Sequence, residues 1–298
     1  MRDSPEILKF KQSILNHKKI AFCWGTLACY RKRKRLLESQ EELKEKNSEQ
    51  NQERKSQTDF GYRRVDPSEK SELVREVFDS VASRYDLMND LMSVGTHRIW
   101  KRHFVDTAGI QKDDTILDLA AGTGDIAKKL TKFVSNKTIH LCDQNKEMID
   151  KAIERSLDEG FYNKCNFNVA SAENLPYKDN YFNHVFISFG FRNFSDKNQC
   201  LKEIQRVLKP GGKLHILEFS RTNGEMFTKI YDFFSFNIIP KIGDLVSNDA
   251  DSYEYLVKSI RTHESQEQLC NMLDSNGFQN TKYTNLFKGI VAIHQGEK

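Results

Sequence analysis

The stretch ILDLAAGTGD, Ile116 to Asp125, decides the fold class of this 298-residue chain. An apolar run suited to a buried strand ends in two glycines around a threonine, and an amphipathic segment follows. A strand, a glycine turn and a helix in this order are typical of a nucleotide-binding unit. Gly122, Gly124 and Ala127 also fit G-x-G-x-x-A, one form of the dinucleotide fingerprint. The turn alone is compatible with NAD, with S-adenosylmethionine (SAM) and with a tight connection that binds nothing.

Strand-like and helix-like segments alternate after this turn. We expect further strands at 138–143, 165–170, 182–190, 213–219, 281–287 and 289–296. We expect helices at 74–85, 125–133, 146–160 and 197–208 and near 267–273, with a turn at 209–212. This alternation predicts a Rossmann-like, doubly wound α/β fold, in which helices cover both faces of a mostly parallel sheet.

The charge of the chain is concentrated at its N-terminal end. Residues 1–58 contain 14 Lys and Arg against 8 Asp and Glu, a net charge of +6, whereas the whole chain carries +4, so that residues 59–298 carry −2. This balance disfavours a nucleic-acid-binding body. Residues 1–37 are basic and partly apolar, and residues 38–57 are polar with little to bury. We therefore expect an extension over 1–58 that is disordered or acts in targeting, followed by one folded domain over 59–298.

Cysteine usage and hydropathy exclude several classes of protein. The six cysteines are scattered without a C-x-x-C pair, which is typical of reduced thiols in an intracellular protein. No set of His, Cys and carboxylate residues has the spacing of a metal site, so we predict a reaction without a metal. The longest apolar run, Ile20 to Tyr30, is shorter than the ~20 residues that a membrane-spanning helix needs.

Polar residues near the strand ends favour one of the candidate ligands. Asp118 and Asp125 flank the glycine turn with negative charge, which disfavours a pyrophosphate and favours the cationic sulfonium and ammonium groups of SAM. Asp143, at the end of the second strand, is placed to accept hydrogen bonds from ribose hydroxyls. Ser171 and Ala172 follow the third strand, where a small polar loop can bracket an adenine. These features favour a methyl donor over a hydride donor, with an NAD oxidoreductase as the alternative.

Several longer motifs resemble one known family. They are VFDSVASRYDLMNDLMSVGTHRIWKR (77–102), ISFGFRNFSD (187–196), RVLKPGG (206–212) and NDADSYEYLVKSIR (248–261). From about Thr58 to Gly296 the chain resembles the ubiquinone/menaquinone biosynthesis C-methyltransferases. The resemblance implies a class I SAM-dependent methyltransferase fold with a seven-stranded sheet and helical lid insertions.

The resemblance also implies an activity and partners. The expected reaction is C-methylation of a ring carbon on a polyprenylated benzoquinol (2-methoxy-6-polyprenyl-1,4-benzoquinol) and, in organisms that make menaquinone, on demethylmenaquinol. The expected partners are this lipid substrate, a membrane surface, other quinone-biosynthesis proteins and a second copy in a homodimer. A SAM-binding scaffold without activity and a methyltransferase for another phenolic lipid remain as alternatives.

Matching motifs assign residues to the cofactor. The implied SAM contacts are Thr123, Asp143, Ser171, Ala172 and Ser188, besides Asp118, while Gly122 and Gly124 shape the turn. Ala121 stands where the family usually has a third glycine, and alanine is accommodated if this position does not need a positive φ.

The chemistry of a quinol suggests the catalytic residues. Its ring carbon becomes nucleophilic when a hydroxyl loses its proton, so the site must accept or stabilise that proton. Arg192 and Asn193, just past the fourth strand, are candidates to stabilise the phenolate. Asp86, or a water held by Tyr85 and Asn193, is the candidate proton acceptor. The alternative is structural: Tyr85 as the last core position of its helix, and Arg192 as an ion-pair partner on the surface.

The prenyl chain needs an apolar groove. Aromatic and aliphatic side chains between Tyr231 and Ile239, with Met88, Leu91 and Met92, predict such a groove, and ordinary core of a helical lid is the alternative. We expect a peripheral protein of the bacterial inner membrane, on the cytoplasmic side. If the basic extension is a presequence, the location is instead the matrix face of the mitochondrial inner membrane.

Overall fold

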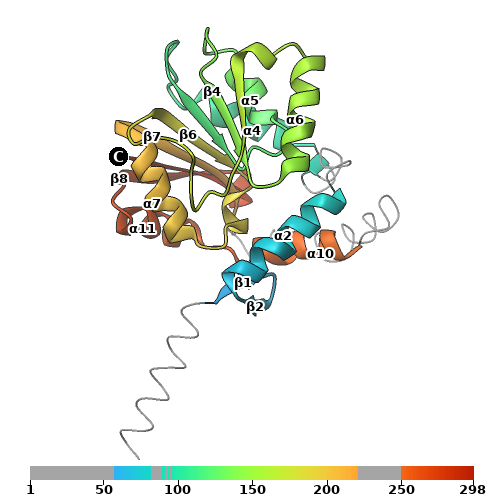
Figure 1. Ribbon diagram of the computed structural model, residues 1–298. Helices are drawn as coiled ribbons and strands as arrows, with labels where there is room; N and C mark the ends of the chain where they lie inside the picture. The colour runs from blue at the N-terminus through green and yellow to red at the C-terminus, as the bar shows by residue number, and fades with distance from the viewer. Residues whose placement is uncertain (1–56, 82–88, 91–92, 94, 221–249) are drawn as a thin grey trace, which may run out of the picture. The chain divides into compact units, whose positions relative to one another are not determined.

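The fold is built around a seven-stranded sheet with the strand order β5-β4-β3-β6-β7-β9-β8 (Figure 1). The computed structural model describes residues 57–81, 89–90, 93, 95–220 and 250–298. The neighbours β3, β4, β5, β6 and β7 pair in parallel, and β9 pairs antiparallel with both β7 and β8. The expected doubly wound, mostly parallel seven-stranded sheet is therefore confirmed.

Most strands and helices begin and end within five residues of the predicted ones, but α2 begins seven residues before the helix predicted at 74–85. The strands of the sheet are β3 (Ile116–Leu119), β4 (Ile139–Asp143), β5 (Cys165–Val169), β6 (Phe182–Ser188), β7 (Leu208–Phe219), β8 (Gln279–Leu286) and β9 (Val291–Glu297). The main helices are α2 (Pro67–Val81), α4 (His97–Asp106), α5 (Asp125–Leu130), α6 (Lys146–Asp158), α7 (Lys197–Val207), α10 (Ala250–Thr262) and α11 (Gln266–Ser275).

Three parts of the structure were not anticipated in this form. An antiparallel hairpin, β1 (Thr58–Phe60) and β2 (Arg63–Val65), precedes α2. Helix α4 lies in a segment for which no helix was predicted. The turn predicted at 209–212 falls inside β7, whose pairing with β6 shifts register between Phe182 and His184. Gly211 there has a φ of 75°, so the predicted turn exists as an irregularity within a continuous strand.

Alternate side chains of the central strands enter two separate cores. Ile116 of β3 and Phe186 of β6 belong to a cluster that includes Phe104 of α4 and Leu130 of α5. Leu117 belongs to a second cluster, on the side of α7 and α11. Because successive strand side chains point to opposite faces, a sheet covered on both sides needs apolar residues throughout, and β3 is buried along its whole length.

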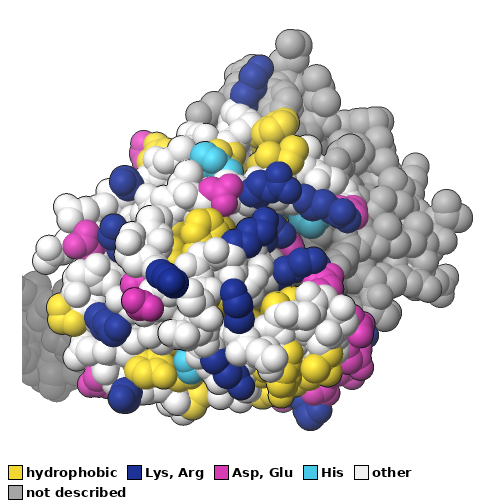
Figure 2. All heavy atoms as spheres, turned by 90° about the horizontal axis from the view of Figure 1, so that it is seen from above, with side chains coloured by type: hydrophobic (Ala, Val, Ile, Leu, Met, Phe, Trp, Pro, Cys, Tyr) yellow, Lys and Arg dark blue, Asp and Glu magenta, His cyan; other side chains and the backbone are white. Residues whose placement is uncertain are grey.

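The folded part of the chain also carries a basic surface. Figure 2 shows many Lys and Arg side chains on the face seen from above. A surface hollow formed by α4, α5 and α6 is lined by seven Lys and Arg against three Asp and Glu. Several of these cations are paired, as Lys128 is with Glu159 at 2.8 Å, and Lys164 donates to the main-chain oxygens of Thr131 and Val134. The positive charge is therefore not confined to the N-terminal extension.

None of the described helices is long and apolar enough to cross a membrane. The predicted extension, residues 1–58, lies outside the described residues except for Gln57 and Thr58. Its boundary therefore stays a prediction.

Candidate functional site

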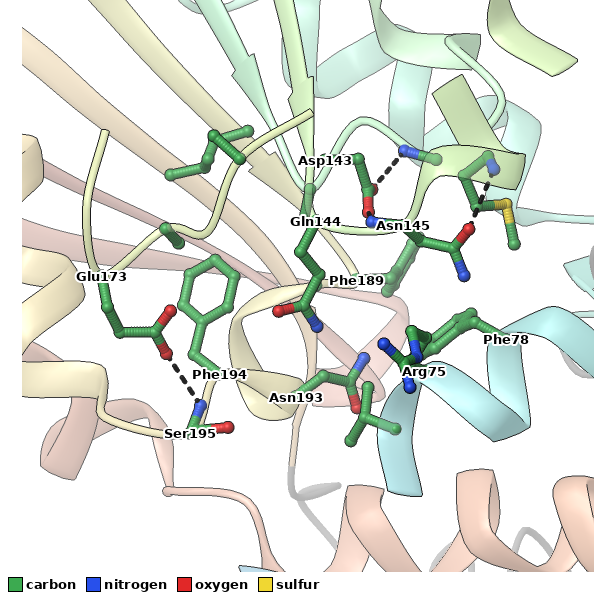
Figure 3. Close-up of a pocket in the computed structure, with 18 of the residues that line it drawn as sticks. Arg75, Phe78, Asp143, Gln144, Asn145, Glu173, Phe189, Asn193, Phe194 and Ser195 are labelled. Atoms are coloured by element: carbon green, nitrogen blue, oxygen red, sulfur yellow. Dashed lines mark hydrogen bonds between the residues drawn. The ribbon is translucent and has the colours of Figure 1, made fainter. Parts of the chain in front are cut away.

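A cavity of about 710 Å³, counting its open mouth, lies at the carboxyl ends of the parallel strands (Figure 3). Its walls come from the segments that follow β3, β4, β5 and β6, and from α2. In doubly wound sheets ligands bind at this edge, where the crossovers diverge on either side of the central strands. Figure 3 shows Arg75 and Phe78 of α2 on one side of the cavity and Glu173, Phe194 and Ser195 on the other.

Five of the predicted site residues line this cavity. They are Gly122, Asp143, Ala172, Ser188 and Asn193. The first three come from the ends of β3, β4 and β5 or the segments after them, and the last two come from the end of β6 and the turn after it. The Ser188 hydroxyl is buried without a hydrogen-bond partner among the described residues. A buried hydroxyl of this kind usually has a partner, so Ser188 is available to a ligand.

The glycine turn has the conformation that its sequence suggests. Gly122 and Gly124 have φ values of 54° and 79°, in the left-handed region that favours glycine. A Cβ at Gly124 would also lie 3.1 Å from Cδ2 of Leu141. Ala121 does not have a positive φ, which explains why alanine is tolerated there, whereas its neighbour Ala120 has a φ of 54°.

Two non-glycine residues at the cavity adopt left-handed backbone conformations. Ala120 and Phe189, with φ values of 54° and 58°, follow the ends of β3 and β6, and both line the cavity. Such conformations cost roughly 1–2 kcal/mol per residue and cluster at functional sites. No sequence pattern pointed to these two residues.

Asp143 closes the turn from the neighbouring strand. Its Oδ2 accepts a hydrogen bond from Gly122 N and its Oδ1 accepts one from Asn145 N, both at 2.9 Å. Burial raises the pKa of Asp143, while these main-chain donors act in the opposite direction. Each carboxylate oxygen keeps a second lone pair, so Asp143 can also accept from the hydroxyls of a ribose in the cavity.

The two carboxylates that flank the turn have structural partners instead. Neither Asp118 nor Asp125 is among the residues that line the cavity. Asp118 is buried, its Oδ2 accepts from Ala127 N at 3.0 Å, and burial raises its pKa well above the usual range. Burial also opposes the charge of Asp125, but Lys101, whose Nζ lies 3.0 Å from Oδ2, and Lys129 outweigh it and hold the pKa of Asp125 low. The charge argument for a cationic ligand, made from this pair, is not supported by the structure.

Thr123 and Ser171 also face protein groups. Thr123 Oγ1 accepts from Arg155 at 3.4 Å, and the Ser171 hydroxyl is bonded to the carboxylate of Glu173. Neither residue is among those that line the cavity, so their contacts with SAM stay predictions.

Arg192 is buried in an ion pair. Its Nη1 donates to Glu218 Oε1 at 2.6 Å and to Phe189 O at 2.7 Å, while its Nε donates to Ser259 Oγ at 3.3 Å. The guanidinium is not among the groups that line the cavity. The guanidinium is thus paired within the protein, so its predicted contact with a phenolate stays a prediction, and the ion pair lies in the interior rather than on the surface.

Asn193, the neighbour of Arg192, does line the cavity. Its Oδ1 accepts from the Tyr255 hydroxyl at 3.1 Å. Tyr85 and Asp86 lie outside the described residues, as do Met88, Leu91, Met92 and residues 231–239. The predictions that rest on these residues stay predictions.

The model of the ubiE/COQ5 methyltransferase family matches residues 66–298, 233 positions of this chain. The chain belongs to this family. It is 48% identical over 248 residues to the "Ubiquinone/menaquinone biosynthesis C-methyltransferase UbiE" of Proteus mirabilis (strain HI4320), which covers 83% of this chain and 99% of that protein. The protein of the same name from Yersinia pestis (strain Pestoides F) is 49% identical over 245 residues, with 82% and 98% covered.

Solved structures share the fold of this ubiE/COQ5 family member at low sequence identity. A chain of the complex between the Haloferax volcanii Trm112 methyltransferase activator and the putative methyltransferase aligns with a TM-score of 0.54 at 16% identity, covering 74% of this chain and 96% of that one. A SAM-dependent methyltransferase from Thermotoga maritima aligns with a TM-score of 0.53 at 18% identity, covering 75% and 99%. The class I methyltransferase fold is thus confirmed.

As a member of the ubiE/COQ5 family, the protein is a SAM-dependent methyltransferase, and the NAD alternative is excluded. The residues present fit this cofactor: the cavity offers the Asp143 carboxylate, the unpartnered hydroxyl of Ser188 and the glycine turn. Sequence reasoning missed a further polar residue of the wall, Arg75, which is the one Lys or Arg among the described residues that line the cavity. No sequence pattern pointed to Arg75, which follows the buried Val74 on α2 and is itself exposed.

Proposed function

We propose that this protein transfers the methyl group of SAM to a ring carbon of a polyprenylated benzoquinol, 2-methoxy-6-polyprenyl-1,4-benzoquinol, in ubiquinone biosynthesis. In a cell that makes menaquinone, demethylmenaquinol is a second acceptor. The observation that carries this proposal is the similarity of about 48% identity, over nearly the whole length of relatives named for ubiquinone/menaquinone biosynthesis. The cavity at the strand ends supplies the place for the reaction.

Three residues of the cavity wall would hold SAM. Asp143 would accept from the ribose hydroxyls, and Ser188 would bond to a polar group near the end of β6. Arg75 has no hydrogen-bond or ion-pair partner within the described parts of the chain, so its guanidinium can pair with the carboxylate of the methionine moiety. Bound there, SAM supplies an activated methyl group on a cationic sulfur.

The chain's own residues must then hold the acceptor ring and its oxygen. Tyr255 donates to the Asn193 Oδ1, which fixes the side-chain amide so that its nitrogen is the group left to donate. Asn193 is therefore our candidate for stabilising the phenolate oxygen. Arg192 supports this turn from behind, through Glu218 and Ser259. Asp86, or a water held by Tyr85 and Asn193, remains our proposed proton acceptor.

A lipid substrate also sets the location. We place the enzyme on the surface of the bacterial inner membrane, or on the matrix face of the mitochondrial inner membrane if residues 1–58 act as a presequence. Other quinone-biosynthesis proteins and a second copy of the chain are the proposed partners. The prenyl chain would lie against the aromatic segment 231–239.

A labelling experiment tests the reaction. Purified protein is incubated with methyl-labelled SAM, a reductant and lipid extracts from cells blocked at quinone C-methylation, and the quinones are then separated by chromatography. Label in a prenylated quinone is the expected result, and its retention time distinguishes a benzoquinone from a naphthoquinone. The Asp143→Ala variant serves as the matched control, because it should lose the cofactor and the label together. Wild-type protein that binds SAM but labels no quinone would contradict the proposed acceptor.

A further inference from the structure

Lys70 of α2 is buried, with 1% of its surface exposed, and has no salt-bridge partner in the described parts of the chain. A lysine in this situation is unusual, because burial of an ammonium group is costly unless its protons are bonded. Its Nζ donates to Phe194 O at 3.0 Å, to Arg192 O at 3.3 Å and to Thr58 Oγ1 at 3.4 Å. Two of the three acceptors are therefore main-chain oxygens of one turn.

These two oxygens stand on either side of Asn193, in the turn that follows β6. The turn contains η3 (Phe191–Asn193), and both Asn193 and Phe194 line the cavity. Lys70 therefore bonds to the peptide groups that flank the residue proposed to meet the acceptor's oxygen. Tyr255 holds the side chain of the same residue.

The opposite wall of the cavity belongs to the helix that carries Lys70. Val74 and Phe78 lie one and two turns further along α2, at i+4 and i+8, on the same face of the helix. Both line the cavity. Lys70 thus joins the wall formed by α2 to the wall formed by the β6 turn.

The ammonium keeps its charge at neutral pH. Burial lowers the pKa of Lys70 to about 8, Lys197 acts in the same direction, and Glu264, Asp59 and Glu173 oppose them. All three N–H donors are then present to bond with the three oxygen acceptors.

We infer that Lys70 is a positioning residue for methyl transfer, which fixes the separation of the two cavity walls and the placement of Asn193. Lys70 itself does not touch the cavity, so it acts through the turn. The inference rests on the proposed function for the reaction in which Asn193 takes part. The effect of Lys70 on cofactor binding does not depend on the identity of the acceptor.

The test compares Lys70→Met with Lys164→Met. Lys164 is a matched control because its Nζ also donates to two main-chain oxygens, Thr131 O at 2.7 Å and Val134 O at 2.9 Å, and it does not line the cavity. For each variant we would measure the melting temperature, the dissociation constant of S-adenosylhomocysteine by calorimetry, and kcat and KM with the quinol acceptor. The rates are normalised to the fraction of the protein that binds S-adenosylhomocysteine.

We expect both variants to melt earlier, and only Lys70→Met to change the site. In Lys70→Met the dissociation constant should rise about 10-fold, and kcat at saturating SAM should fall about 10- to 100-fold, because small misplacements of reacting groups have effects of this size. Wild-type kcat and cofactor affinity in folded Lys70→Met would overturn the inference. Equal losses in Lys164→Met would also overturn it, because the effect would then follow stability alone.

Two features of the design keep the outcomes distinct. If Lys70→Met does not fold, Lys70→Gln replaces it, because its amide keeps N–H donors. An unchanged kcat in folded Lys70→Gln overturns the inference, and a reduced kcat supports it. If the wild-type protein methylates no quinol, the proposed function fails, and the change in cofactor affinity still decides the role of Lys70.

Discussion

The turn after β3 and the turn after β6 meet at the carboxyl edge of the sheet, so closely that a Cβ at Gly190 would lie 2.6 Å from Cβ of Ala120. The turn after β3 is held by nearby residues: Asp118 bonds to an amide nine residues away, and Asp143 bonds to one 21 residues away. The turn after β6 is held by residues as far as 124 positions away, the separation of Lys70 and Phe194.

This difference separates a locally encoded turn from one that exists only in the folded protein. Glycines with positive φ allow the first turn to form wherever a strand precedes a helix. The second turn depends on α2, β7 and α10, through Lys70, Glu218 and Tyr255. We therefore expect changes at the first turn to affect mainly ligand binding, and changes behind the second to affect stability and catalysis.

The largest expected effect is a loss of stability when the ion pair behind the turn after β6 is broken. Glu218→Gln leaves the buried charge of Arg192 without its partner, so the free energy of unfolding should fall by about 3–5 kcal/mol. Chemical denaturation measures this change. As a control, Asp150→Asn disrupts the exposed pair between Lys146 and Asp150 and should change it by less than about 1 kcal/mol. Similar losses in both variants would show that the Arg192–Glu218 pair has no special role.

The next largest effect is a loss of cofactor affinity when Asp143, which bonds to the turn after β3, is replaced. Asp143→Ala removes the proposed acceptor of the ribose hydroxyls and should weaken S-adenosylhomocysteine binding about 100-fold, since hydrogen bonds to a charged group contribute roughly 1.5–3 kcal/mol each. Calorimetry measures the affinity. Asp118→Asn is the matched control, because the amide oxygen can still accept from Ala127 N and the residue does not line the cavity. Equal losses in the two variants would contradict the separate roles assigned to these carboxylates.

A pH titration sharpens the comparison for the second turn. The pKa of Lys70 is about 8 in the folded protein, below its ordinary value, so between pH 8 and about 10.5 the unfolded chain binds more protons at this residue than the folded one. The contribution of Lys70 to the unfolding free energy should therefore rise with pH in this range, by up to about 1.4 kcal/mol per pH unit. Denaturation of wild type and Lys70→Met from pH 7 to 10 measures it as a difference. A constant difference would show that the Lys70 ammonium is not perturbed.

The smallest expected effect is a loss of affinity for the amino-acid carboxylate of the cofactor. Arg75→Gln should weaken S-adenosylhomocysteine binding about 10-fold, as expected for the loss of an exposed ion pair strengthened by hydrogen bonds. Methylthioadenosine lacks the amino-acid carboxylate, so its affinity should not change. Parallel titrations of the two ligands give the result. Equal weakening of both would place Arg75 near the nucleoside rather than the carboxylate.

Much of the fold could be predicted because its signals are local. The alternation of apolar strands and amphipathic helices indicated the doubly wound sheet, and the glycine turn indicated the edge of the sheet where the cavity lies. Asp143 was correctly placed at the end of its strand, and it bonds to Gly122 N because the carboxyl ends of adjacent parallel strands meet at one edge. The choice of SAM over NAD was correct, although the charges of Asp118 and Asp125 are compensated within the protein and did not justify it.

The sequence by itself determined the alternation of strands and helices from β3 onward, the glycine turn and the family, because these depend on short-range patterns and motifs. Only the tertiary structure decided that Arg192 pairs with Glu218 in the interior, that Arg75 faces the cofactor cavity and that Lys70 bonds to the turn around Asn193. A charged side chain in a sequence gives no indication of its partner. Its role depends on which distant oxygen atoms the fold brings within hydrogen-bond distance, and on whether water still reaches them.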